Sequence, residues 1–166
     1  FSLKWYNRSI IIIEGDVTSL KKFDHRPTWD EYFLEQAKLA ATRSSCERAK
    51  VGAVITVDNA CIATGYNGGV AGMDNCCDVG HYLEDGHCIR TVHAEMNAIL
   101  QSARQGHATL NGTIYVTHYP CINCMKAIAQ AGIKRIVYDQ DYRNHELSKA
   151  ITDSLDIEVV KLKGEE

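Results

Sequence analysis

Two short clusters hold the side chains with the clearest chemistry. In "HAE", His93 and Glu95 stand two residues apart at the start of an apolar stretch. Residues two apart point to nearly opposite sides of a helix. Both side chains can therefore face one pocket only if the helix begins at about His93. In "PCINC", Pro120 precedes Cys121 and Cys124. Together the clusters offer an imidazole, a carboxylate and two thiols.

The two cysteines are well placed to bind a metal. A proline suits the start of a helix, where its missing N–H costs little, so Cys121 and Cys124 share one face of the first turn. A helix N-terminus also favours the thiolate form of cysteine. With the neutral imidazole of His93 they make a three-ligand set with an open fourth position, which is how proteins hold catalytic zinc. Glu95 is left as a nearby carboxylate that need not bind the metal.

Each cluster alone has a plainer interpretation. His-x-Glu is usually a surface pair or a helix cap, and Cys-x-x-Cys also occurs as a redox motif. A redox motif explains neither His93 nor Glu95. A non-catalytic binding module stabilised by zinc explains the ligands, but it explains neither the spare Glu95 nor the three-ligand set. The joint pattern matches H-x-E…P-C-x-x-C, the signature of zinc-dependent base deaminases.

Deamination would use these residues in defined roles. Zinc lowers the pKa of a bound water. Glu95 would take its proton, pass it to N3 of a pyrimidine and then protonate the departing amine, acting as base and then as acid. The N–H of Ala94 would bond the pyrimidine O2. The carbonyl of Tyr119 would accept from the amino group.

Composition limits the alternatives. The chain has 166 residues with a net charge of −3, which fits one domain and lacks the basic excess of a nucleic-acid-binding protein. No apolar run approaches the length of a membrane span. Seven cysteines, an odd number, and no secretory leader favour metal or reactive thiols over disulfides. We therefore expect a cytoplasmic protein that binds neither membrane nor nucleic acid.

The elements that must position the clusters follow from the sequence pattern. Residues 1–26 show no sustained period and are expected to be an extension of unknown role, with one domain over 27–166. "TWDE" is a capping box that begins a helix at Thr28, and 51–68 predicts a hairpin about Asp58-Asn59. Further helices are predicted at 94–104, 121–132 and 144–154, and strands at 113–117, 133–138 and 157–160. This alternation predicts a mixed sheet with right-handed crossovers.

Two segments of this pattern bear directly on the site. The helix over 94–104 places four apolar residues on one face, namely Met96, Ile99, Leu100 and Ala103. Residues 68–92 are rich in glycine, cysteine, histidine and aspartate and show neither a helical nor a strand period.

In these motifs the sequence resembles the zinc-dependent cytidine deaminase-like superfamily and, within it, the deoxycytidylate (dCMP) deaminases of bacteria and phages. The resemblance spans roughly 27–162 through "RSSC", "KVGAVI", "GYNGGVAGMDNCC", "HCIRTVHAEMNAIL" and "YVTHYPCINC". It implies an α/β fold, a three-layer α/β/α sandwich about a five-stranded mixed sheet, with the two metal-binding helices side by side. It also implies hydrolysis of dCMP to dUMP and ammonia, in the supply of deoxynucleotides for dTMP synthesis. His93, Cys121 and Cys124 would hold the zinc and Glu95 would carry the proton.

The resemblance also suggests how the substrate is held. Asn67 matches the position that binds the sugar 3′-hydroxyl, and Tyr119 is a candidate wall of the substrate pocket. Lys50 and Arg90 are the candidates for the phosphate, although each is better explained as a surface or structural cation. The main alternative is a tRNA adenosine deaminase, which shares the zinc motif. The acidic balance of the chain and the 68–92 insertion favour a nucleotide.

A second metal site is expected in the cysteine-rich segment. Cys46 and Cys76 match ligands of a structural zinc in phage-type members of the family. Histidines and cysteines this dense in an irregular loop suggest a closed zinc site. His81 is the expected third ligand, with either Cys88 or its neighbour His87 as the fourth, because adjacent residues rarely both reach one metal.

Regulation is the last implication of the resemblance. dCMP deaminases are homo-oligomers, expected here as a hexamer, activated by dCTP with Mg²⁺ and inhibited by dTTP. "GYNGGVAG" is a glycine-rich loop whose free N–H groups can hold phosphates. Gly65, Tyr66 and Gly68 are therefore candidate contacts for a regulatory nucleotide.

Overall fold

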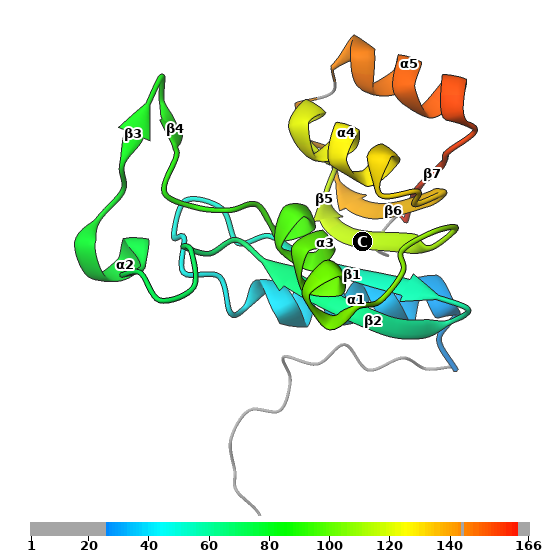
Figure 1. Ribbon diagram of the computed structural model, residues 1–166, viewed down its shortest axis with the longest axis horizontal. Helices are drawn as coiled ribbons and strands as arrows, with labels where there is room; N and C mark the ends of the chain where they lie inside the picture. Colours follow the sequence, from blue (N-terminus) through cyan, green and yellow to red (C-terminus); the bar gives the residue numbers. More distant parts are fainter. Residues whose placement is uncertain (1–25, 144, 163–166) are drawn as a thin grey trace, which may run out of the picture.

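The computed structural model describes residues 26–143 and 145–162. Apart from residue 26, the expected N-terminal extension lies outside the described residues. The elements follow one another along the chain as shown in Figure 1: α1 (Trp29–Ala41), β1 (Gly52–Val57), β2 (Ala60–Tyr66), α2 (Cys76–Val79), β3 (Leu83–Glu84), β4 (His87–Cys88), α3 (Ala94–Gln105), β5 (Thr113–His118), α4 (Ile122–Gln130), β6 (Arg135–Gln140), α5 (Glu146–Leu155) and β7 (Glu158–Lys161).

Five strands form one mixed sheet in the order β2-β1-β5-β6-β7. Strand β1 runs antiparallel to both β2 and β5, whereas β5, β6 and β7 are parallel. Parallel neighbours require crossovers, which α4 and α5 provide. The predicted mixed sheet is confirmed, and so is the hairpin, since Asp58 and Asn59 both have the positive φ of a tight hairpin turn.

Helices cover both faces of the sheet. Successive strand residues point to opposite faces, so Ile55 of β1 belongs to one apolar cluster and Val54 to another. The first cluster includes Ala98 of α3 and Met125 of α4, and the second includes Phe33 of α1. The three-layer α/β/α sandwich is therefore confirmed. No helix in the described ranges is both long and apolar enough to cross a bilayer.

The predicted apolar face of α3 is only partly buried, since Ile99 packs against the core but Leu100 does not. The buried residues of α3 are Ala94, Glu95, Ala98 and Ser102, whereas Leu100 is 53% exposed. The helix lies so close to β2 that a Cβ added to Gly65 would stand 2.1 Å from the carbonyl oxygen of Ala94. Only small side chains fit at that distance, so Leu100 is turned outward while Ile99 is partly buried against the core.

Residues 69–91 form an arm that projects from the sandwich (Figure 1). Gly68 and Val92 close its base by exchanging both backbone hydrogen bonds, at 3.2 and 2.8 Å. The arm contains the short helix α2 and the small hairpin of β3 and β4. Its sequence shows no period because none of these elements is longer than four residues.

Candidate active site

The N-termini of α3 and α4 bring the two sequence clusters together. His93 is the N-cap of α3, with φ −66° and ψ 153°, and Cys121 is the N-cap of α4. His93 is thus still in extended backbone while Glu95 is in the first helical turn. The helix therefore begins at His93, as is required for both side chains to face one pocket.

The three expected ligands lie at zinc-binding distances. Nδ1 of His93 is 3.6 Å from Sγ of Cys121 and 3.5 Å from Sγ of Cys124. A tetrahedral zinc with Zn–N of about 2.0 Å and Zn–S of about 2.3 Å separates nitrogen from sulfur by about 3.5 Å. The donor set therefore fits this metal. His93 is exposed and Cys124 is buried, so the cluster is open to solvent on the histidine side.

The charges of the two cysteines are coupled. Hydrogen bonding from Cys124, and then from His93, lowers the pKa of Cys121 to about 3. The same hydrogen bond and burial raise the pKa of Cys124. The pKa of His93 is raised by its hydrogen bond to Cys121. One thiolate is thus favoured by the protein alone, and a divalent cation would offset the cost of the second.

Glu95 is a buried carboxyl group beside this cluster. Its residue is only 4% exposed, and burial raises its pKa to about 7. A group with a pKa near neutrality can both accept and donate a proton under working conditions. Glu95 therefore has the properties of a general acid–base.

Two of the expected substrate contacts are bonded to each other. The N–H of Ala94 donates to Oδ1 of Asn67 at 3.0 Å, and Nδ2 of Asn67 donates to the carbonyl oxygen of Ala49 at 3.1 Å. The single hydrogen of Ala94 N–H is therefore already used, so a bond to a pyrimidine O2 requires this contact to yield. Oδ1 of Asn67 still has a second lone pair for a hydroxyl donor.

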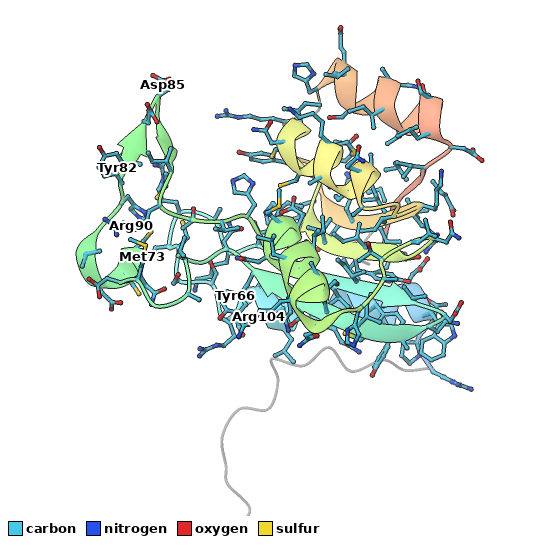
Figure 2. All side chains as sticks on the ribbon, viewed as in Figure 1. Tyr66, Met73, Tyr82, Asp85, Arg90 and Arg104 are labelled. Atoms are coloured by element: carbon cyan, nitrogen blue, oxygen red, sulfur yellow. The ribbon has the colours of Figure 1, made fainter. Side chains whose placement is uncertain are left out.

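The remaining substrate candidates differ in their positions. Tyr119 is half-buried and packs edge-on against Tyr138, with ring centroids 5.1 Å apart. Lys50 is exposed. Arg90 lies on the arm (Figure 2), close enough to Cys76 to influence its pKa, so the structure associates it with the arm and its cysteines.

A second set of potential ligands gathers on the arm. Ligand atoms of Cys76, His81 and Cys88 all lie within 4.8 Å of one another. Sγ of Cys76 and Sγ of Cys88 are 3.8 Å apart, which is about the separation of two sulfurs on a tetrahedral zinc. Nδ1 of His81 is buried without a hydrogen-bond partner among the described residues. A zinc ion would satisfy that atom.

Cys46 is the candidate for the fourth ligand of this set. Burial, then Cys88 and then Cys46 raise the pKa of Cys76, which places Cys46 nearby, and Cys46 is itself buried. Burial opposes ionisation of Cys88, but hydrogen bonds from His81 and the backbone lower its pKa to about 6. Between the two neighbours, Cys88 joins the set, and the side chain of His87 lies outside the description.

A cavity lies beside the predicted regulatory loop. Its volume is about 650 Å³, and Gly65, Tyr66 and Gly68 all line it. Asn97 and Arg104 also line the cavity. No sequence pattern marks these two residues, because polar side chains on a helix usually form a solvated face. Figure 2 shows Tyr66 and Arg104 near each other on the same side of the molecule. The missing side chain of Gly65 serves the close approach of α3.

These features define a class of enzyme. The family model described as the cytidine and deoxycytidylate deaminase zinc-binding region matches residues 27–140. The chain belongs to this family.

Individual relatives narrow the comparison. ComE operon protein 2 of Bacillus subtilis is 47% identical over 85% of this chain and 75% of its own length. The deoxycytidylate deaminase of Mycobacterium phage D29 is 42% identical over 70% of this chain and 98% of its own. The crystal structure of dCMP deaminase from cyanophage S-TIM5 in complex with dCMP and dUMP is 34% identical. It has a TM-score of 0.72 and covers 83% of this chain and 99% of that one.

Proposed function

We propose that this chain hydrolyses dCMP to dUMP and ammonia. The observation that carries the proposal is the buried Glu95, with a pKa near neutrality, beside a His/Cys/Cys set at zinc-binding distances. The phage D29 relative is named a deoxycytidylate deaminase, and the S-TIM5 structure holds dCMP and dUMP. Those names favour a nucleotide substrate over a tRNA.

Each residue of the site would have a defined role. His93, Cys121 and Cys124 would hold the zinc, which would lower the pKa of a bound water. Glu95 would accept the first proton of the attacking water and deliver it to N3 of the pyrimidine while C4 is attacked. The same carboxylate would then take the second proton from the new hydroxyl on C4 and give it to the amino group, which leaves as ammonia. Its burial keeps bulk water away from these transfers.

The substrate is held by groups around this cluster. The free lone pair of Asn67 Oδ1 accepts from the 3′-hydroxyl of the sugar, and Tyr119 forms one wall of the pocket. Ala94 N–H turns from Asn67 to the pyrimidine O2 when the substrate enters. The carbonyl of Tyr119 accepts from the amino group.

Substrate choice decides between this function and its alternatives. Purified protein is incubated separately with dCMP, dCTP, deoxycytidine and a tRNA anticodon arm, and ammonia release is followed. We expect rapid release from dCMP alone. Release from the tRNA arm would support the adenosine deaminase, and no release from any of the four would support a non-catalytic zinc-binding module.

We also propose a structural zinc on the arm, held by Cys46, Cys76, His81 and Cys88. The gathered ligand atoms, the unpartnered nitrogen of His81 and the burial of Cys46 support it. The deaminase domain would span 27–166. All seven cysteines are free thiols, which is consistent with work in the cytoplasm.

The cavity beside Gly65, Tyr66 and Gly68 is proposed as the regulatory nucleotide site. Tyr66 offers an aromatic face for a base, and Arg104 offers a positive charge for phosphates. We propose that dCTP with Mg²⁺ activates the enzyme through this site, that dTTP inhibits it, and that the active form is a homohexamer.

A further inference from the structure

The cavity and the catalytic cluster share one wall of backbone. On the cavity side stand Tyr66 and Gly68, at the end of β2. On the other side stands Val92, the residue before the zinc ligand His93. Gly68 N–H donates to the carbonyl oxygen of Val92, and Val92 N–H donates to that of Gly68. The chain that lines the cavity is therefore bonded directly to the chain that enters the metal site.

Asn97 ties these two segments together with one side chain. It lines the cavity, and its Nδ2 donates to the carbonyl oxygen of Tyr66 at 2.8 Å and to that of Val92 at 3.3 Å. Its backbone N–H donates to the carbonyl oxygen of His93 at 2.9 Å. Side chains on a helix lean toward its N-terminus, so Asn97 reaches back over the turn that begins at His93.

We propose that Asn97 is a positioning residue for the zinc ligand His93 and that it couples the occupancy of the cavity to the metal site. Its two donors fix the carbonyl oxygens on either side of the shared wall. A ligand that moves Tyr66 must stretch the bond to Asn97 or carry Val92 along with it. The coupling half of this inference rests on the proposed regulatory site, whereas the positioning half needs only the hydrogen bonds.

The geometry of the zinc ligands makes such a movement consequential. Nδ1 of His93 stands 3.5 and 3.6 Å from the two sulfurs, so a small shift of Val92 changes the metal geometry directly. Residues that orient metal ligands by hydrogen bonds typically contribute about 10- to 100-fold to metal affinity or activity. A change of that size in metal affinity can be measured without an activity assay.

Zinc release to a chromogenic chelator tests the positioning role. Zinc leaving the His93, Cys121 and Cys124 site gives a release phase, called the catalytic phase, that is missing from Cys121→Ala. Zinc leaving the arm gives a separate release phase, called the arm phase, which serves as an internal control. We expect Asn97→Ala to speed the catalytic phase about 10-fold and to leave the arm phase unchanged. Asn97→Asp should speed it more, because its carboxylate would face two carbonyl oxygens.

Gln101 provides the matched control. It lies one turn further along α3, lines the same cavity and carries the same amide, but its side chain has no hydrogen bond within the described part of the chain. Gln101→Ala should release zinc at the parental rate. Equal catalytic-phase rates in the parent and Asn97→Ala would overturn the positioning role. So would a general loss of thermal stability that speeds both phases alike.

The coupling half is tested with dCTP and Mg²⁺ as the probe. Binding is measured by equilibrium dialysis, and zinc release is measured with and without the nucleotide. We expect dCTP to change the catalytic release rate of the parent, and to bind to Asn97→Ala without changing its rate. An unchanged response in the variant would overturn the coupling. If dCTP does not bind to the parent, the regulatory site and the coupling both fail, while the release rates still decide the positioning role.

Discussion

Replacement of Glu95 by glutamine should separate catalysis from stability. The amide has nearly the same shape as the carboxyl group and removes no zinc ligand, but it can neither accept nor deliver the proton. General acid–base groups typically contribute about 10²- to 10⁴-fold to the rate. We therefore expect Glu95→Gln to keep its zinc and to lose activity by at least about 10²-fold.

The stability effect follows from the buried charge. The pKa of Glu95 is about 7 in the metal-free folded chain, against an ordinary value of 4.5. The folded state then holds this proton more tightly than the unfolded state, so the free energy of unfolding falls as pH rises from 4.5 through 7. At about 1.4 kcal/mol per pH unit, the full loss is about 3 kcal/mol. Glu95→Gln cannot ionise and should not show this loss.

Denaturant unfolding of metal-stripped protein measures the difference. Zinc adds positive charge beside the carboxylate and would mask the effect, so parent and variant are compared without metal at pH values from 4.5 to 8. The variant should gain stability relative to the parent as pH rises, by about 3 kcal/mol at pH 8. If the free energy of unfolding changed with pH in the same way in parent and variant, the raised pKa of Glu95 would be refuted. Activity of the variant within about tenfold of the parent would refute the catalytic role of Glu95.

Three further predictions concern the metals, the helix contact and regulation. Elemental analysis should find two zinc ions per parent chain and one in either Cys121→Ala or Cys76→Ala. Only Cys121→Ala should abolish turnover directly, and Cys76→Ala should expose the arm to proteases. Gly65→Ala should lower the melting temperature sharply and Gly68→Ala only slightly, because the added Cβ would stand 2.1 Å from a backbone oxygen in the first and 3.3 Å from a movable ring in the second. The dependence of the rate on dCMP concentration should be sigmoidal and become hyperbolic with dCTP and Mg²⁺. A monomer with hyperbolic kinetics that neither dCTP nor dTTP changes would contradict the regulatory proposal.

The closeness of His93, Cys121 and Cys124 could be predicted from the sequence because these residues lie at helix starts. A proline before Cys121 and an apolar run after His93 mark where each helix begins, and so fix which way the side chains face. The strands could be predicted for a similar reason, since their alternation is local. These signals need only a few neighbouring residues.

Contacts between distant segments could not be predicted in the same way. The buried face of α3 is set by the distance of the helix from Gly65, which no helical period records. The period groups Leu100 with Ile99, although Leu100 is exposed. The bond between Ala94 N–H and Asn67 joins residues 27 apart. The role of Asn97 depends on two carbonyl oxygens, which every residue possesses and no sequence motif distinguishes.

The closed base of the arm has a consequence for engineering. Gly68 and Val92 already form a hydrogen-bonded antiparallel pair, which is the geometry that a two-residue turn can close. Residues 69–91 could therefore be excised and replaced by Asn-Gly, or exchanged for a loop of another length, without a change in the register of the sheet. Such a variant would lose two contacts between the core and the arm, the hydrogen bond from Arg48 to the carbonyl oxygen of Gly86 and the approach of Cys46 to Cys76.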